Sequence, residues 1–446
     1  MKKYNEYIDV GLPWYPHGIP SHWSLVRHKS ILTEHKELVG ENSANYTLLS
    51  LTLNGVIIRD ISEGKGKFAK DYDKYVVVDE GDFVFCLFDV EETPRTVGLS
   101  KHHGMITGAY DVFKPLDINS EYFYYYYLAL DNVKALKPLY SGLRKVIPYP
   151  TFMAMKAPVP TKNEQEQIVH YLDWKISNIN RLIHGYQRQI KLLEEYKKSQ
   201  ITHLVTHGIE KHKMIDSEIY WLESVPKDWR VTRLKHILKK QQRSIPENAE
   251  LLICSNSGEV KVRGESKMGL VAESDDIYQG VKKGDLLIHG MDTWHGAIAV
   301  SDFDGMCTPV VHVCTSNESV RFVAYYLKMM AYTKVFKAIS NGVRQNTSDF
   351  RSWDKAGALY IALPSVEEQE MISDKIDDVI SKINNSISVI NREIDTLKEY
   401  RTRLISDVVT GQIDVRDVEI PDYTLVEDNT LNEEIDDIEE VSDDAE

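Results

Sequence analysis

The sequence is poor in cysteine and has no long apolar run. Its 446 residues contain four cysteines and no C-x-x-C pair, which argues against a disulfide framework and a zinc ribbon. No stretch reaches about 18 consecutive apolar residues, and the first residues lack the apolar core of a secretion signal. These absences predict a reduced, cytoplasmic protein that neither spans nor crosses a membrane.

Clustered metal ligands are also scarce. Cys307, His312 and Cys314 could be drawn as a metal site, but the valines between them favour a strand with small buried thiols. Four further histidines lack acidic or cysteine partners at a useful spacing, so we expect them on the surface or in hydrogen-bonded loops: His102, His103, His289 and His295. We therefore predict neither a metal site nor a catalytic residue.

Basic residues are missing from the end of the chain. From Pro421 onward there are twelve Asp or Glu residues and no Lys or Arg, so the net charge of −15 falls to −3 for residues 1–420. Such a composition is typical of a disordered, solvating tail. The tail either serves solubility alone or competes with an anionic partner, and the nearly neutral remainder does not exclude a nucleic acid as partner.

The chain contains an internal duplication. Residues 160–209 match residues 364–413 at a constant offset of 204, and each copy begins with P-x-x-x-E-Q-x-x-I. Thr161 with Glu164, and Ser365 with Glu368, predict a capping box at the start of a helix.

Both copies predict a long coiled-coil helix. Apolar residues recur at alternating spacings of three and four without an intervening proline, from Leu172 to Leu193 and from Ile376 to Leu397. A helix of about 45 residues is roughly 65 Å long and needs an equally long partner. We expect each helix to pack against the other copy; pairing with a second chain is the alternative.

The segments between the helices repeat more loosely and mix short β-rich runs with helical ones, which predicts compact α/β domains. The fold class is therefore mixed α/β, with two globular domains, an antiparallel pair of long helices and a pseudo-twofold duplication. The predicted parts are an N-terminal segment 1–20, a first domain 21–158, a first helix 159–209, a linker 210–226, a second domain 227–362, a second helix 363–413 and a tail 414–446.

The paired P-x-x-x-E-Q-x-x-I motifs and the I/V-P-x-x-W starts at Trp23 and Trp229 resemble the specificity subunit of type I restriction-modification enzymes. The resemblance extends from about Gly18 to about Val415. It implies two target-recognition domains, each reading one half of a bipartite DNA site, and a coiled coil that sets the unread spacer.

The resemblance also implies partners: double-stranded DNA, two methyltransferase subunits and motor-nuclease subunits. S-adenosylmethionine, ATP and magnesium would serve those partners, and this chain would hold no cofactor. The sequence has no N-P-P-F/Y methylation motif, no phosphate loop and no convincing nuclease cluster, which agrees with a non-catalytic subunit. A coiled-coil scaffold without DNA specificity is the alternative, and a stand-alone nuclease or methyltransferase lacks its catalytic motifs.

Base reading favours Arg, Lys, Asn and Gln, whereas Lys, Ser and Thr on loops hold the DNA backbone. The predicted DNA-binding residues are Lys65, Lys67 and Lys70 in a glycine-containing loop, Arg144 and Lys145 in SGLRK, and Asn341, Arg344, Gln345, Asn346 and Thr347 at the equivalent place in NGVRQNT. The tyrosine run 122–127 favours a core over base stacking. Tyr196 and Tyr400 are candidates for docking the methyltransferase subunits.

Overall fold

The computed structural model describes residues 2–59, 72–264, 278–339 and 350–427. The chain divides into two compact units, residues 1–187 with 391–446 and residues 188–390. Each unit therefore contains one globular domain and one half of each long helix, and we describe each unit by itself.

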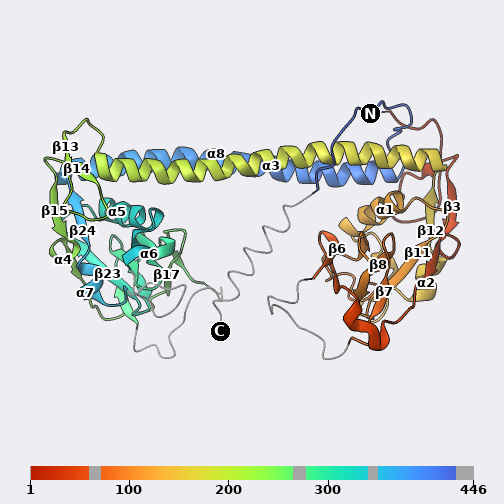
Figure 1. Ribbon diagram of the computed structural model, residues 1–446, viewed down its shortest axis with the longest axis horizontal. Helices are drawn as coiled ribbons and strands as arrows, with labels where there is room; N and C mark the ends of the chain where they lie inside the picture. The colour runs from red at the N-terminus through yellow and green to blue at the C-terminus, as the bar shows by residue number, and fades with distance from the viewer. Residues whose placement is uncertain (1, 60–71, 265–277, 340–349, 428–446) are drawn as a thin grey trace. The chain divides into compact units, whose positions relative to one another are not determined.

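The globular domain of the first unit is built on a four-stranded antiparallel sheet with the strand order β4–β11–β8–β9 (Figure 1). Its strands are β4 (Leu32–Glu34), β11 (Asp111–Pro115), β8 (Phe83–Phe85) and β9 (Val97–Leu99). Three antiparallel pairs accompany it: β3 (Ser24–Arg27) with β12 (Lys156–Val159), β5 (Leu49–Thr52) with β6 (Gly55–Ile58), and β7 (Val76–Val78) with β10 (Gly104–Ile106). Helices α1 (Ser120–Asn132) and α2 (Tyr149–Ala154) complete the domain.

The second unit repeats this arrangement strand by strand, which confirms the mixed α/β class and the duplication. Its four-stranded sheet is β16 (Leu238–Lys240), β23 (Val311–Ser316), β20 (Leu286–His289) and β21 (Ile298–Val300). The accompanying pairs are β15 (Arg230–Arg233) with β24 (Tyr360–Leu363), β17 (Leu252–Cys254) with β18 (Val260–Val262), and β19 (Gln279–Val281) with β22 (Gly305–Cys307). The helices are α4 (Leu234–Ile237), α5 (Val320–Tyr332), α6 (Val335–Ile339) and α7 (Trp353–Gly357).

An aromatic core fills the first domain. Tyr122, Tyr126 and Tyr127 of α1 are buried, and Tyr127 packs edge to face on Phe85 with ring centroids 4.8 Å apart. The core interpretation of the tyrosine run is therefore confirmed. In the second unit Cys307 and Cys314 are buried on β22 and β23, and burial raises the pKa of each thiol to about 12.

Two long helices, α3 (Lys162–His207) and α8 (Val366–Val409), pack together as expected. In the first unit Arg401 of α8 donates to Asn180 of α3 at 2.7 Å, and in the second Lys197 of α3 donates to Asn384 of α8 at 3.3 Å. The start of each helix thus lies beside the end of the other within a unit, so the pair is antiparallel. The predicted seam residues are all buried or half-buried.

The N-terminal segment and the linker after α3 are structural counterparts. In the first, β1 (Tyr7–Ile8) pairs with β2 (Ile19–Pro20), and in the linker β13 (Met214–Asp216) pairs with β14 (Ser224–Pro226). The N-terminal segment also contacts the chain just after α8, because the Asp414 N–H donates to the carbonyl of Lys2 at 3.0 Å. The sequence signal for this likeness is an Ile-Asp pair followed by tryptophan in both segments.

Residues 414–427 run back along α3 in the first unit. Gln167 donates to the carbonyls of Val415 and Val418, and Asn180 donates to that of Val426. The first part of the predicted tail is thus bound to the helix, and residues 428–446 lie outside the described part. No helix among the described residues combines the length and apolar character needed to cross a bilayer.

Candidate nucleic-acid interface

The glutamine of each E-Q motif fastens a globular domain to its long helix. Gln165 accepts a hydrogen bond from the N–H of Asn119 at 2.9 Å and donates to the carbonyl of Pro160 at 2.9 Å. Asn119 is the N-cap of α1. One buried side chain therefore holds the start of α1 against the start of α3.

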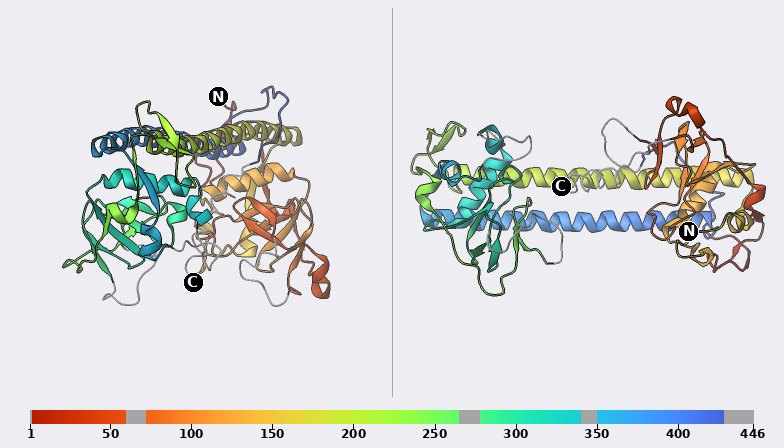
Figure 2. Two further views of the ribbon diagram at one scale, coloured as in Figure 1. Left: turned by 60° about the vertical axis from the view of Figure 1, so that its left-hand side comes forward. Right: turned by 90° about the horizontal axis from the view of Figure 1, so that it is seen from below.

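The second unit repeats this link. Gln369 accepts from the N–H of Ser319 at 2.9 Å and donates to the carbonyl of Pro364 at 3.0 Å, and Ser319 is the N-cap of α5. A tyrosine of each short helix adds a second bond, from Tyr125 to Asp173 at 2.6 Å and from Tyr325 to Asp377. Helices α1 and α5 consequently lie between the long helices and the rest of their domains (Figure 2).

The glutamate of each motif binds the segment that precedes the domain. Glu164 is 5% exposed and accepts from the Tyr4 hydroxyl at 2.6 Å and from Trp23 Nε1 at 3.0 Å. Glu368 pairs with His212 at 3.0 Å. The predicted capping boxes are therefore only partly realised: the Ser365 hydroxyl accepts from the Glu368 N–H at 3.3 Å, but both carboxylates bind side chains from outside the helix start.

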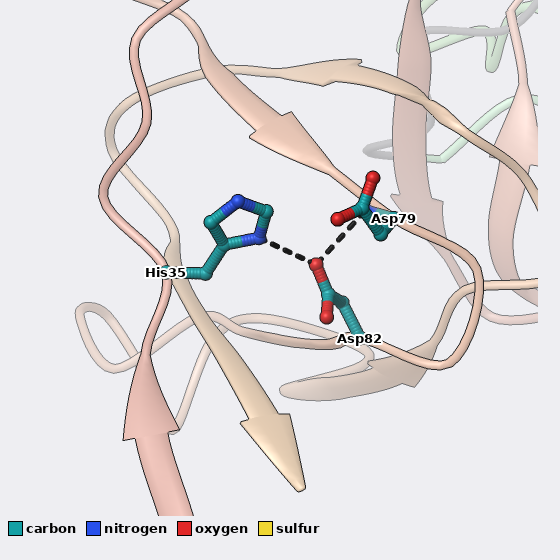
Figure 3. A group of neighbouring side chains, drawn as sticks. All are labelled: His35, Asp79 and Asp82. Atoms are coloured by element: carbon teal, nitrogen blue, oxygen red, sulfur yellow. Dashed lines mark hydrogen bonds and ion pairs between the residues drawn. The ribbon is translucent and has the colours of Figure 1, made fainter.

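A cluster of His35, Asp79 and Asp82 in the first unit has the composition of a metal site (Figure 3). His35 Nδ1 lies 2.7 Å from Asp82 Oδ2, which also accepts from the Asp79 N–H at 2.8 Å. The Asp79 carboxylate accepts from Lys114 and His103, each at 2.9 Å, and these hydrogen bonds lower its pKa. Sequence reasoning missed this cluster because His35 follows β4, whereas Asp79 and Asp82 lie on the turn between β7 and β8.

The second unit shows what the cluster does. Asp285 occupies the place of Asp82, accepts from the Lys282 N–H at 2.8 Å and forms an ion pair with Arg243. A guanidinium thus does in one unit what the His35 ring does in the other. We therefore assign the cluster a structural role, in which a cationic or hydrogen-bonding group braces the turn into the central strand.

The loop 141–146 carries the predicted residues Arg144 and Lys145. An isolated bridge joins Ser141 to Val146, and Gly142 and Lys145 have φ of 68° and 45°, so the loop is a tight turn that projects from the domain. Leu143 at its tip is fully exposed. An apolar side chain beside two cationic ones suits contact with a base edge or a thymine methyl group.

Both cations of this loop are paired within the domain. Arg144 lies 2.7 Å from a carboxylate oxygen of Asp89 and above the ring of Phe88, and Lys145 pairs with Glu91. Hydrogen bonds from Lys137 and Lys145 lower the pKa of Glu91 to about 2. These pairs are exposed and therefore weak, so phosphate or base oxygens can replace the carboxylates.

Three comparisons place this geometry among known proteins. The family model described as the type I restriction modification DNA specificity domain matches residues 96–192. The MjaVIII type I restriction enzyme specificity subunit of Methanocaldococcus jannaschii is 24% identical over 373 residues, which are 79% of this chain and 84% of the relative. The matched domain, the curated relative and the arrangement of the two units agree: the chain is similar to the specificity subunits of type I restriction-modification enzymes.

Two further matches agree with the family. A putative type I restriction enzyme MjaX specificity subunit from the same archaeon is 26% identical over 285 residues, covering 59% of this chain and 60% of the relative. A solved structure described as the structural basis underlying complex assembly and conformational transition of the type I R-M system has a TM-score of 0.60 and 12% identity. The structural match covers 89% of this chain and 100% of the solved chain, and it shows that the two chains share a fold.

Most of the other predicted contact residues cannot be placed, and two are exposed on the long helices. Lys65, Lys67 and Lys70, and likewise Asn341, Arg344, Gln345, Asn346 and Thr347, lie outside the described residues. Tyr196 and Tyr400, the predicted docking residues, are 53% and 42% exposed. Sequence reasoning missed Leu143, although it stands between the glycine and the arginine of the predicted loop.

Proposed function

We propose that each globular domain of this specificity subunit reads one half of a two-part DNA site. The pair α3 and α8 would set the length of the unread spacer and dock methyltransferase subunits. The observation that carries the proposal is the duplication itself: the two domains share the same sheet order and the same glutamine anchor, yet their loops differ in sequence. Two domains with the same fold but different loops are suited to recognise two different half-sites.

The proposal also accounts for the rigidity of the attachment. A reading domain must meet the DNA at a fixed distance and on a compatible face of a turn of 10 to 10.5 base pairs. In the second unit, Phe322 and Tyr326 of α5 share one apolar core with Ile201 of α3 and Ile372 of α8. A domain that shares its core with the helix pair cannot turn independently of it.

Arg344→Ala is expected to lower DNA affinity by about 1 to 3 kcal/mol and to relax one base of the second half-site, because an arginine on a base edge carries that much discrimination. Arg144→Ala should do the same in the first half-site. Selection from a random-sequence DNA pool measures both effects. A changed preference in the wrong half, or unchanged preferences for both variants, would contradict the assignment.

Leu143→Ala is expected to weaken DNA binding by about 1 to 2 kcal/mol, because the leucine exchanges full solvent exposure for an apolar contact on DNA. The free energy of unfolding should stay the same, since the side chain has no packing to lose. Val133→Ala is the matched control, because Val133 is 68% exposed in the same unit but lies outside the loop. Equal binding by both variants would remove Leu143 from the interface.

The proposed partners follow from the same account. Methyltransferase subunits would use S-adenosylmethionine, and motor-nuclease subunits would use ATP and magnesium, so this chain would supply recognition alone. The exposed Tyr196 and Tyr400 lie on the long helices at equivalent repeat positions and are offered as docking residues. A double Tyr→Ala variant should lose co-purification of the methyltransferase while it keeps its thermal midpoint.

The full chain co-purified with its methyltransferase subunits provides the direct test. Selection from a random DNA pool should recover a sequence with two specified parts and an unspecified gap. Recovery of one continuous motif would contradict the division of labour, and recovery of no motif would contradict sequence reading altogether.

A further inference from the structure

A basic cavity of about 580 Å³, open to solvent, is formed by residues of the second unit. Residues 194–198 of α3, the end of α5, the start of α6, the short helical turn Thr293–His295 and the turn between β17 and β18 surround it. Four lysines line it, Lys197, Lys198, Lys334 and Lys337, against one carboxylate, that of Glu194. Its lining therefore carries a net positive charge in a chain that is acidic overall.

Most of this charge is not neutralised. Glu194 lies 2.6 Å from Lys197. Lys198 stands over the ring of Tyr332 and Lys337 over that of Trp294, at 5.7 and 5.9 Å. Among the described residues, no carboxylate forms an ion pair with Lys198, Lys334 or Lys337, and all three are exposed. Their ammonium groups are free to meet an anion.

The equivalent lysines of the first unit are paired with carboxylates, so the unpaired charge distinguishes the second unit from the first. Its counterparts are Lys134 and Lys137, which stand at the same places after α1, and Lys134 shares the unusual positive φ of Lys334. Lys134 lies 2.7 Å from Asp131, and Lys137 lies 2.7 Å from Glu91. In the second unit Ala331 takes the place of Asp131. The same backbone frame thus has its lysines paired in one copy and unpaired in the other.

We infer that this cavity binds phosphate groups of the DNA backbone beside the second half-site. The inference rests on the proposed function and names a place where the subunit would hold DNA without reading bases. Lysine ammonium groups are compact charges that suit phosphate. The helix α6, which carries Lys337, leads in sequence directly to the predicted reading residues 341–347. A backbone anchor next to a reading loop fixes the register in which that loop meets its bases.

The test is the salt dependence of DNA binding by the Lys334→Gln/Lys337→Gln variant of the full chain, in complex with its methyltransferase subunits. Each lost phosphate contact should reduce the slope of log K against log salt concentration by about 0.9. The double variant should therefore lose roughly 2 from the slope, while its selected DNA motif stays the same. An unchanged slope, or a changed motif, overturns the inference.

The matched control is Lys375→Gln/Lys382→Gln. It removes the same charge from two exposed lysines of α8 that pair with Asp378, and it should leave the slope as in the wild type. Chemical acetylation gives an independent readout: duplex DNA should protect Lys334 and Lys337 but not Lys382. Equal protection by ATP alone would indicate a nucleotide site and overturn the inference.

The same data separate this inference from the proposed function. A wild-type complex that shows no sequence preference refutes the proposed function. A smaller slope of the double variant on non-specific DNA would then still support the cavity as a phosphate site.

Discussion

Gln165→Leu is expected to destabilise the first unit by about 2 to 4 kcal/mol. The leucine keeps most of the side-chain volume, but the half-buried Asn119 N–H and the buried Pro160 carbonyl both lose their partner. Each unsatisfied buried group costs about 1 to 3 kcal/mol. Because the same bonds hold α1 against α3, the variant should also lose preference for the first half-site while the second is kept. Chemical denaturation and DNA selection measure the two effects.

The neighbouring position supplies the control. Glu166 is exposed on the next residue of α3, so Glu166→Leu makes a similar change without removing an anchor. Gln369→Leu should destabilise the second unit in the same way and should lower the preference for the second half-site instead of the first. If Gln165→Leu unfolds at the same denaturant concentration as Glu166→Leu, the E-Q motif does not anchor the domain.

Lengthening both long helices is expected to move the two half-sites apart. One heptad inserted after Gln187 and another after Ile390, at the boundary of the two units, keeps the apolar seam in phase and adds about 10.5 Å. That displacement corresponds to about three base pairs, at which the second half-site has turned to another face of the duplex. Binding to the original site should weaken by at least about 3 kcal/mol, since each mismatched base pair in a recognised half-site costs about 1 to 3 kcal/mol.

Three heptads in each helix should restore binding on a longer site. Twenty-one residues add about 32 Å, close to one turn of DNA, so the preferred spacer should grow by about nine or ten base pairs. Selection with the lengthened variants reads the spacer directly. Variants that keep the original spacer would show that the helices do not measure the distance between half-sites.

Much of the architecture could be predicted because its signals are local or repeated. The spacing of apolar residues predicted helices at 159–209 and 363–413, and α3 and α8 occupy 162–207 and 366–409. The E-Q motif marks the helix starts, but the sequence alone does not show which groups its two side chains bind. Three of the partners of Gln165 and Glu164, namely Asn119, Tyr4 and Trp23, lie 46 to 160 residues away.

The candidate site was harder to predict because it depends on exposure and on pairing between distant residues. The sequence identified the basic loop at Arg144, but only the structure distinguishes the exposed Leu143 from other leucines. Lys134 and Lys334 likewise occupy equivalent places in the repeat. Lys134 pairs with the carboxylate of Asp131, whereas the second unit has Ala331 at the equivalent position. This difference becomes visible only when the two units are compared.

Single-molecule sequencing of DNA from cells that co-express this chain with its methyltransferase subunits tests the central claim most directly. We expect methylated adenines in a two-part motif. Exchange of residues 21–158 for the domain of another specificity subunit should change one half of that motif, and exchange of residues 227–362 should change the other. If either exchange alters both halves, or if no adenine methylation depends on this chain, the assignment of one half-site to each domain is wrong.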